Sequence, residues 1–159
     1  MTTRNTRYWR KFLSNLLTSS NVLNEITQRS SAYDGVCVLT LSGRVVYRDG
    51  CFHAASLSSD SLDIVDPLQI LALFDHVTRQ AIQKERHVES VTPALRIGLH
   101  VFHIVSTTCS SICAVTCGKT RGLVVEKLPF GVLVVAFSAP LRLETVFRHL
   151  DDACAALRL

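Results

Sequence analysis

The sequence has little of what marks chains that cross membranes or remain disordered. Its apolar runs are only a few residues long, well short of the ~20 residues that a helix needs to span a bilayer. Glycine and proline are few, with 7 and 4 in 159 residues, and no stretch has the simple composition of a linker. We therefore expect order nearly throughout and no transmembrane segment.

Charge of one sign is also missing from any long stretch. Seventeen basic and 13 acidic residues leave a net charge of +4, and apart from a basic cluster at residues 4–11 the lysines and arginines stand singly. This pattern gives no stripe for a nucleic acid. No apolar stretch follows the basic cluster, so we predict a cytosolic protein rather than a secreted one, and a mitochondrial targeting segment stays an open alternative.

The cysteines show no close CxxC pair, although there are six of them. Zinc sites normally use such pairs, pinched by a turn. The even spacing of residues 109, 113 and 117 would line one face of a helix or strand. We predict reduced, metal-free thiols that behave as small buried apolar groups. The six are Cys37, Cys51, Cys109, Cys113, Cys117 and Cys154.

Groups that could support catalysis are scattered. His100 and His103 stand at an odd separation, which directs them to opposite faces of a strand. The segment 118–120, Gly-Lys-Thr, ends like a phosphate-binding loop, but Cys113 stands where that loop needs glycine. We predict a protein that is not an enzyme and holds no cofactor or metal, with a Cys/His pair as the remaining alternative.

Two helices are predicted in the first half of the chain. Apolar residues recur every three or four positions over 8–29, as one helix or as two that break at 19–21. The second helix begins at Asp66-Pro67 and ends between 84 and 87, because aspartate caps a helix and proline suits its first position. Between them we predict a hairpin of strands 36–41 and 44–47 around Ser42-Gly43, then a loop over 49–66.

The second half is predicted to be a strand meander and a terminal helix. Turn signals leave strands near 95–97, 99–106, 111–117, 122–127 and 131–138, joined by loops too short for a crossover helix. Pro140 ends the last strand, and an apolar stripe follows over 143–157. With 48% hydrophobic residues, the chain can form a single α+β domain over 1–159, an antiparallel sheet between N- and C-terminal helices.

This order of elements resembles profilin over nearly the whole chain. The best matching stretch runs from the basic, glycine-rich turn Gly118-Lys119-Thr120-Arg121-Gly122 through the apolar strand ending at Lys127 and on to the apolar strand 132–137. The resemblance implies a profilin-like fold and a cytoskeleton-associated protein that binds monomeric actin with its meander face and terminal helix. The implied actin-binding residues are Lys119, Arg121, Lys127, Arg142, Glu144 and Arg148, all expected to be exposed.

Profilins also bind proline-rich peptides between their terminal helices through aromatic side chains. Trp9 and Phe12 fall on two of these positions. The hairpin aromatic falls on Val46, with Tyr47 one residue away, and the terminal-helix aromatic falls near Ala153. Because a polyproline helix is held by aromatic faces, we expect proline-rich binding at Trp9, Phe12 and Tyr47 to be weakened.

Roadblock and longin-like modules provide an alternative. These non-catalytic subunits of dynein and membrane-trafficking complexes share the order of elements and form dimers through their long helix, so a homodimer is also possible here. The long helix predicted over 67–87 favours them. The segment 94–138 is too long for their three-stranded meander and favours profilin.

Overall fold

The structure is a computed structural model that describes residues 33–52, 68–74, 94–97, 100–155, 157 and 158, together with Lys11, which is helical. The predicted helix over 8–29 otherwise lies outside the described residues. Residues 68–74 form a helix within the predicted 66–87. The labelled elements are β1 (Gly35–Leu39), β2 (Val45–Gly50), β3 (Ala94–Ile97), β4 (His100–Thr107), β5 (Ser111–Thr116), β6 (Arg121–Leu128), β7 (Gly131–Ser138) and α4 (Leu143–Ala155).

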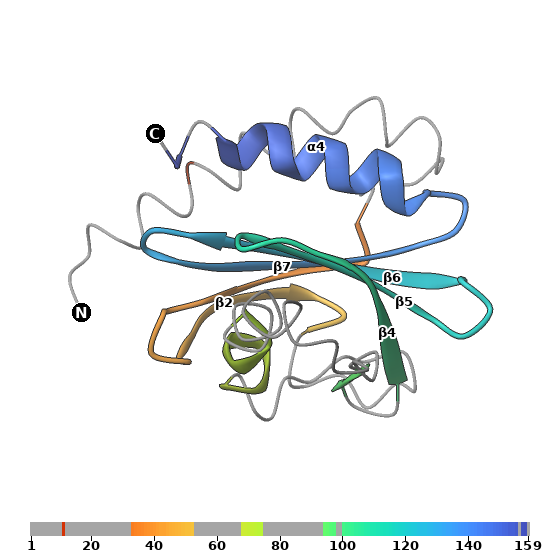
Figure 1. Ribbon diagram of the computed structural model, residues 1–159, viewed down its shortest axis with the longest axis horizontal. Coiled ribbons are helices and arrows are strands. Elements are labelled where there is room, and N and C mark those ends of the chain that lie inside the picture. Colours follow the sequence, from red (N-terminus) through yellow and green to blue (C-terminus); the bar gives the residue numbers. More distant parts are fainter. Residues whose placement is uncertain are drawn as a thin grey trace, which may run out of the picture.

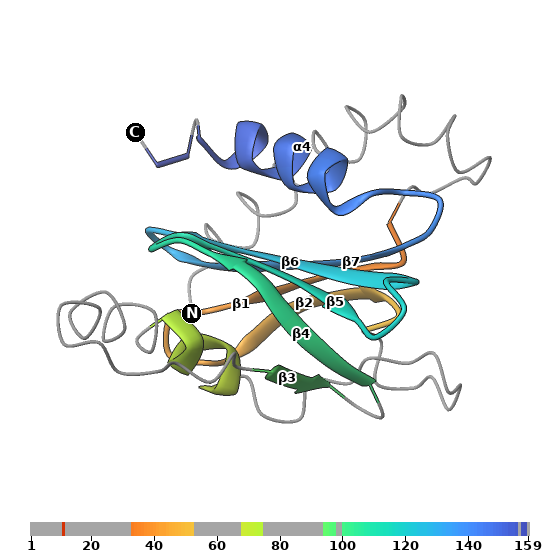
Figure 2. The same ribbon diagram turned by 45° about the vertical axis from the view of Figure 1, so that its right-hand side comes forward.

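One seven-stranded sheet organises the chain, in the order β2-β1-β7-β6-β5-β4-β3. Every neighbouring pair is antiparallel. The last strand lies beside the first, with Leu39 opposite Val132, so the N-terminal hairpin extends the meander formed by residues 94–138. Figure 2 shows the sheet twisting, with β4 and β3 curling away from α4. The α+β fold and the five-stranded antiparallel meander are confirmed.

The sheet separates two apolar cores. On one face, Val146, Leu150 and Cys154 of α4 pack against alternate residues of β1, β5, β6 and β7. On the other face, Ile70 and Phe74 of the helix 68–74 pack against the intervening residues. Figure 1 shows α4 above the sheet and this helix below it. Because both faces are covered, β6 and β7 read as nearly continuous apolar runs rather than as alternating patterns.

The structure confirms the predicted hairpin turn and corrects two other expectations. Gly43 has a φ of 90° in the β1–β2 turn, as predicted for the hairpin. The predicted loop over 49–66 starts too early, because cross-strand pairing carries β2 on to Gly50. Cys109, Cys113 and Cys117 do not line one face, since only Cys113 lies in a strand and the other two lie in exposed turns. In the part of the chain that the structure describes, no helix is long and apolar enough to cross a membrane.

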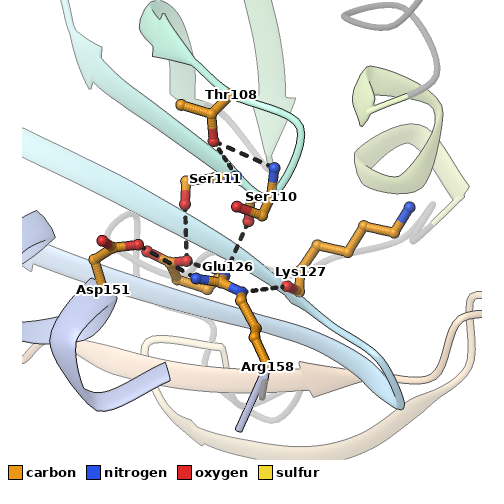
Figure 3. A network of polar contacts seen from close by, with 7 residues as sticks. All are labelled: Thr108, Ser110, Ser111, Glu126, Lys127, Asp151 and Arg158. Atoms are coloured by element: carbon orange, nitrogen blue, oxygen red, sulfur yellow. Dashed lines mark hydrogen bonds and ion pairs between the residues drawn. The ribbon is translucent and has the colours of Figure 1, made fainter. Parts of the chain in front are cut away.

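A buried carboxylate interrupts the apolar run of β6. Glu126 is 0% exposed, on the face that α4 covers. Its Oε2 accepts a hydrogen bond of 2.8 Å from the hydroxyl of Ser111 and forms an ion pair with Arg158. Figure 3 shows the arginine reaching across from the residues that follow α4.

Arg158 also donates hydrogen bonds to three other residues around it. Its Nε donates to the carbonyl oxygen of Lys127 at 3.1 Å, and its guanidinium donates to the carbonyl oxygen of Ser110 at 3.2 Å and to Asp151 Oδ1 at 3.3 Å. The β4–β5 turn, β6 and the C-terminal end of α4 are therefore tied together by one side chain. Burial raises the pKa of Glu126, and the hydrogen bonds and charge of Arg158 together with the Ser111 hydroxyl oppose that rise only in part.

Replacing Arg158 with alanine should destabilise the fold by about 3 kcal/mol, because it leaves a buried carboxylate without its cation. Urea unfolding at pH 7 measures this loss. In the double variant Arg158→Ala/Glu126→Gln the added cost of the arginine deletion should be much smaller, since a neutral amide needs no counter-charge. Equal costs of the Arg158 deletion in both backgrounds would contradict the pairing.

The raised pKa of Glu126 predicts a pH dependence with a definite sign. The folded state holds the proton more tightly than the unfolded state, so the contribution of Glu126 to stability is present below the ordinary pKa of 4.5 and is lost as pH rises through the raised value. Wild-type stability should therefore fall relative to Glu126→Gln as pH increases above about 4.5. Parallel urea titrations of both proteins from pH 4 to 8 test this, and a widening wild-type advantage with pH would show the opposite sign.

Candidate functional site

A cavity of about 320 Å³ opens at the end of the sheet where the β5–β6 turn, the β7–α4 connection and the first turn of α4 meet. These segments lie together on the right of Figure 1. The lining combines apolar side chains of β4, β5 and β7 with charged side chains at the edge. Its residues are Val105, Val115, Lys119, Arg121, Phe137, Ala139, Pro140, Leu141, Arg142, Leu143 and Glu144.

The apolar floor of the cavity depends on a glycine. Gly122 of β6 lies opposite Phe137 of β7, and the phenyl ring extends over it. A Cβ on Gly122 would lie 2.2 Å from Cζ of Phe137, so only glycine leaves room for the ring in this position. Sequence reasoning missed both residues as site residues, because an apolar strand and a turn-proximal glycine carry no functional signal by themselves.

Val105 gives the cavity an exposed apolar wall. The β4–β5 register shifts between Ile104 and Ser106, and Val105 is left 60% exposed at this irregularity. Among the described residues Val105 is one of four large apolar side chains that are exposed, with Leu41, Leu68 and Phe130, and it is the one of the four that lines the cavity. Sequence reasoning had no signal for this exposure, because the sheet is covered on both faces and adjacent apolar residues are buried together elsewhere, as in β7.

Four of the six sequence-predicted actin-binding residues surround this cavity. Lys119, Arg142 and Glu144 are exposed, as expected, whereas Arg121 is half-buried. Arg121 Nη1 lies 3.1 Å from His100 Nε2, so its guanidinium is engaged within the protein. Arg148 is exposed four residues after Glu144, which places it on the same side of α4.

Lys127 does not join this group. It lies at the opposite end of β6 from Arg121, and its Nζ lies 5.6 Å from the ring centroid of Phe74, which belongs to the face of the sheet away from α4. The expectation of an exposed side chain is wrong for Lys127, which is half-buried, as it is for Arg121. The reason is that β6 is covered on both faces.

The predicted proline-rich site is only partly described. Tyr47 is half-buried and packs with Val46 and Ala153 against the α4 side of the core. Trp9 and Phe12 lie outside the described residues. Val46 and Ala153, where the resemblance led us to look for aromatics, are small, partly buried side chains packed against the core.

The described residues include no metal-binding group, and their buried thiols are poorly reactive. Among the described residues no three His, Cys, Asp or Glu side chains are placed to hold a metal ion. Burial raises the pKa of Cys113 and Cys154 to about 12, and that of Cys51 to about 11 despite the nearby Arg121. Thiols with such pKa values stay protonated at neutral pH and are poor nucleophiles.

Comparison with known proteins supports the fold. No family model and no curated protein sequence matches the chain. Among solved structures, profilin IA of Acanthamoeba castellanii aligns with a TM-score of 0.59 and 14% identity, over 94% of this chain and 95% of that one. A chain of the LokiProfilin1–rabbit actin complex aligns with a TM-score of 0.59 and 12% identity, over 94% and 93%. A chain of the LokiProfilin2–rabbit actin complex aligns with 0.57 and 10%, over 99% and 97%. The chain thus has a profilin-like fold.

Replacing Gly122 with alanine should cost about 1–3 kcal/mol, because the new methyl group forces the Phe137 ring out of its place. Chemical denaturation measures the loss. The second substitution Phe137→Leu should recover part of it, since a shorter side chain no longer overlaps the methyl group. Equal losses with phenylalanine or leucine at position 137 would show that the ring does not set the requirement for glycine.

Proposed function

We propose that this protein binds monomeric actin through the surface around the cavity, as a profilin-like regulator of the actin cytoskeleton in the cytoplasm. The observation that carries the proposal is a convergence. Three residues that the sequence singles out come from distant segments and border one cavity with apolar walls. Lys119 lies in the β5–β6 turn, and Arg142 and Glu144 lie at the start of α4. Two structural neighbours were crystallised with rabbit actin, which supports this choice of partner.

The arrangement has the anatomy of a protein-binding surface. Fully buried apolar groups at the centre of an interface supply most of the binding energy, and a polar rim excludes water and selects the partner. Here Val105 and Val115 provide apolar contact area, and the charged side chains of the β5–β6 turn and of α4 form the rim. A role of this kind requires neither catalysis nor a cofactor.

The rim charges favour an acidic partner surface. Lys119 and Arg142 place two exposed positive charges near the cavity, against one exposed carboxylate, Glu144. Charge complementarity acts mainly on the association rate and weakens with salt. Proline-rich peptide binding is not part of this proposal, because Val46 and Ala153 offer no aromatic face.

Arg142→Glu should weaken binding of purified monomeric actin at least tenfold at low salt, and Val105→Asp should weaken it at least as much by placing a charge in the apolar centre. Isothermal titration calorimetry with latrunculin-stabilised monomers measures both. Arg44→Glu, an exposed charge in the β1–β2 turn at the far end of the sheet, should bind like wild type. Absence of actin binding by the wild-type protein would refute the proposed function.

Lys127→Gln separates the surface inferred from the structure from the one inferred from sequence alone. Lys127 lies away from the cavity, so its neutralisation should change actin affinity less than twofold. A loss matching that of Arg142→Glu would show that the partner covers β6 as far as its other end and contacts the opposite face of the sheet. Thermal melting of each variant checks that the fold is retained.

A further inference from the structure

Exposed apolar side chains gather at the end of the sheet opposite the cavity. Of the four large apolar side chains that are exposed among the described residues, three lie away from the cavity: Leu41, Leu68 and Phe130. Leu41 belongs to the β1–β2 turn and Phe130 to the β6–β7 turn. Because Leu39 of β1 pairs with Val132 of β7, these two turns leave the sheet side by side, on the left of Figure 1. We call the three exposed side chains the turn patch.

Leu68 belongs to this group because the helix 68–74 begins against the β1–β2 turn. A Cβ built on Gly43 of that turn would lie 2.6 Å from Cδ2 of Leu68. The helix buries one side in the core of the face away from α4, whereas Leu68 is 58% exposed and Ala72, one helical turn further on the same side, is also exposed. A helix that is apolar on all sides is normally buried. The outward side of this one therefore lacks the polar residues that suit contact with water.

The charged side chains beside the turn patch are basic. Arg44 is exposed in the same turn as Leu41. Lys127 extends from β6 toward the helix 68–74, as Figure 3 shows, and its Nζ lies 5.6 Å from the ring centroid of Phe74. Neither of the two turns nor the helix 68–74 contains an acidic residue. The turn patch thus presents apolar contact area with positive charge beside it.

These charges decide which partner fits. A second copy docked through the same patch would bring like charges together, which is unfavourable across an interface. Binding to an anionic bilayer typically takes clusters of about four to eight lysines and arginines, whereas the described residues place two cations here, one of them half-buried. A protein segment that carries carboxylates beside its apolar side chains matches both the apolar area and the charge.

The position of the turn patch selects the form of this segment. The patch lies at strand ends rather than along the edge of the sheet, so it offers an extended peptide no ladder of backbone groups to pair with. An α-helix needs no such ladder, because its backbone groups bond within the helix. Its side chains at i, i+3, i+4 and i+7 form one apolar face that suits side-chain contact alone.

We propose that the turn patch is a second protein-binding surface, which takes the apolar face of an amphipathic helix with acidic side chains beside that face. Leu41, Leu68 and Phe130 supply the contact area. Arg44 and Lys127 pair with the carboxylates. Because the turn patch and the cavity lie at opposite ends of the sheet, the two surfaces can be occupied together (Figure 1). This inference does not depend on actin binding.

Selection on the full-length protein from a phage library of random peptides, each long enough for about four helical turns, tests this surface. Enriched peptides should carry leucine or phenylalanine at helical spacing, with aspartate or glutamate beside them. Fluorescence anisotropy should show their affinity falling at least about tenfold in Phe130→Ser and in Leu68→Ser. Arg44→Glu should weaken binding about fivefold at low salt and less as salt is added.

Two control variants accompany these substitutions, and melting temperatures check that each variant is folded. Phe130→Leu keeps an apolar side chain and should bind within about threefold of wild type. Arg96→Glu reverses an exposed charge in β3, at the other edge of the sheet from β2, and should bind like wild type.

Enrichment of no peptide, enriched peptides without acidic residues, or equal binding by wild type and Phe130→Ser would overturn the inference. A wild-type dimer that Phe130→Ser dissociates in analytical ultracentrifugation would assign the patch to a second copy instead. Sedimentation with phosphatidylserine vesicles that the same variant abolishes would assign it to a membrane. Either result would also overturn the inference, and none of these outcomes bears on actin binding at the cavity.

Discussion

The ion pair between Glu126 and Arg158 is the interaction on which the arrangement of the α4 face depends. Glu126 lies in a strand whose apolar residues belong to cores on both faces of the sheet, and a carboxylate in such surroundings is costly unless it is paired. Its partner comes from the residues after α4 and also binds the β4–β5 turn and Asp151. This pairing therefore ties the C-terminal end of α4 to the sheet, and the other end of α4 places Glu144 at the cavity, next to Arg142 just before the helix.

The fold could be predicted from sequence because its signals are local and redundant. Turn residues separate five apolar strands, and loops too short for a crossover leave only antiparallel pairing. The hairpin glycine at position 43 and the apolar stripe of the terminal helix were equally clear. The Glu126–Arg158 pair was not predictable, because nothing in the spacing of two charges 32 residues apart states that a strand and a chain end will meet.

The candidate site, like the fold, was predictable where local signals place a residue and not where tertiary packing does. Lys119, Arg142 and Glu144 could be chosen from sequence, since turns and helix starts place charges in solvent and the profilin resemblance pointed to them. Arg121 and Lys127 were misjudged as exposed, because burial of a strand on both faces is a tertiary property that a single charged residue in an apolar run does not reveal. Val105 and the Gly122–Phe137 pair depend on strand register, which the sequence specifies only through the whole sheet.

Proteins of one fold can present similar binding surfaces although few of their residues are identical, because a partner contacts side chains at particular positions of the structure. The three solved structures compared above are 10–14% identical to the chain, too little to transfer any residue's role. The cavity is a stronger argument for the proposed binding surface than sequence identity is. It brings an exposed apolar wall, a floor that depends on Gly122 and charges of both signs into one place. Val105, exposed beside the charged side chains of the β5–β6 turn and of the start of α4, places an apolar contact area next to a polar rim, and the proposed actin binding rests on this juxtaposition.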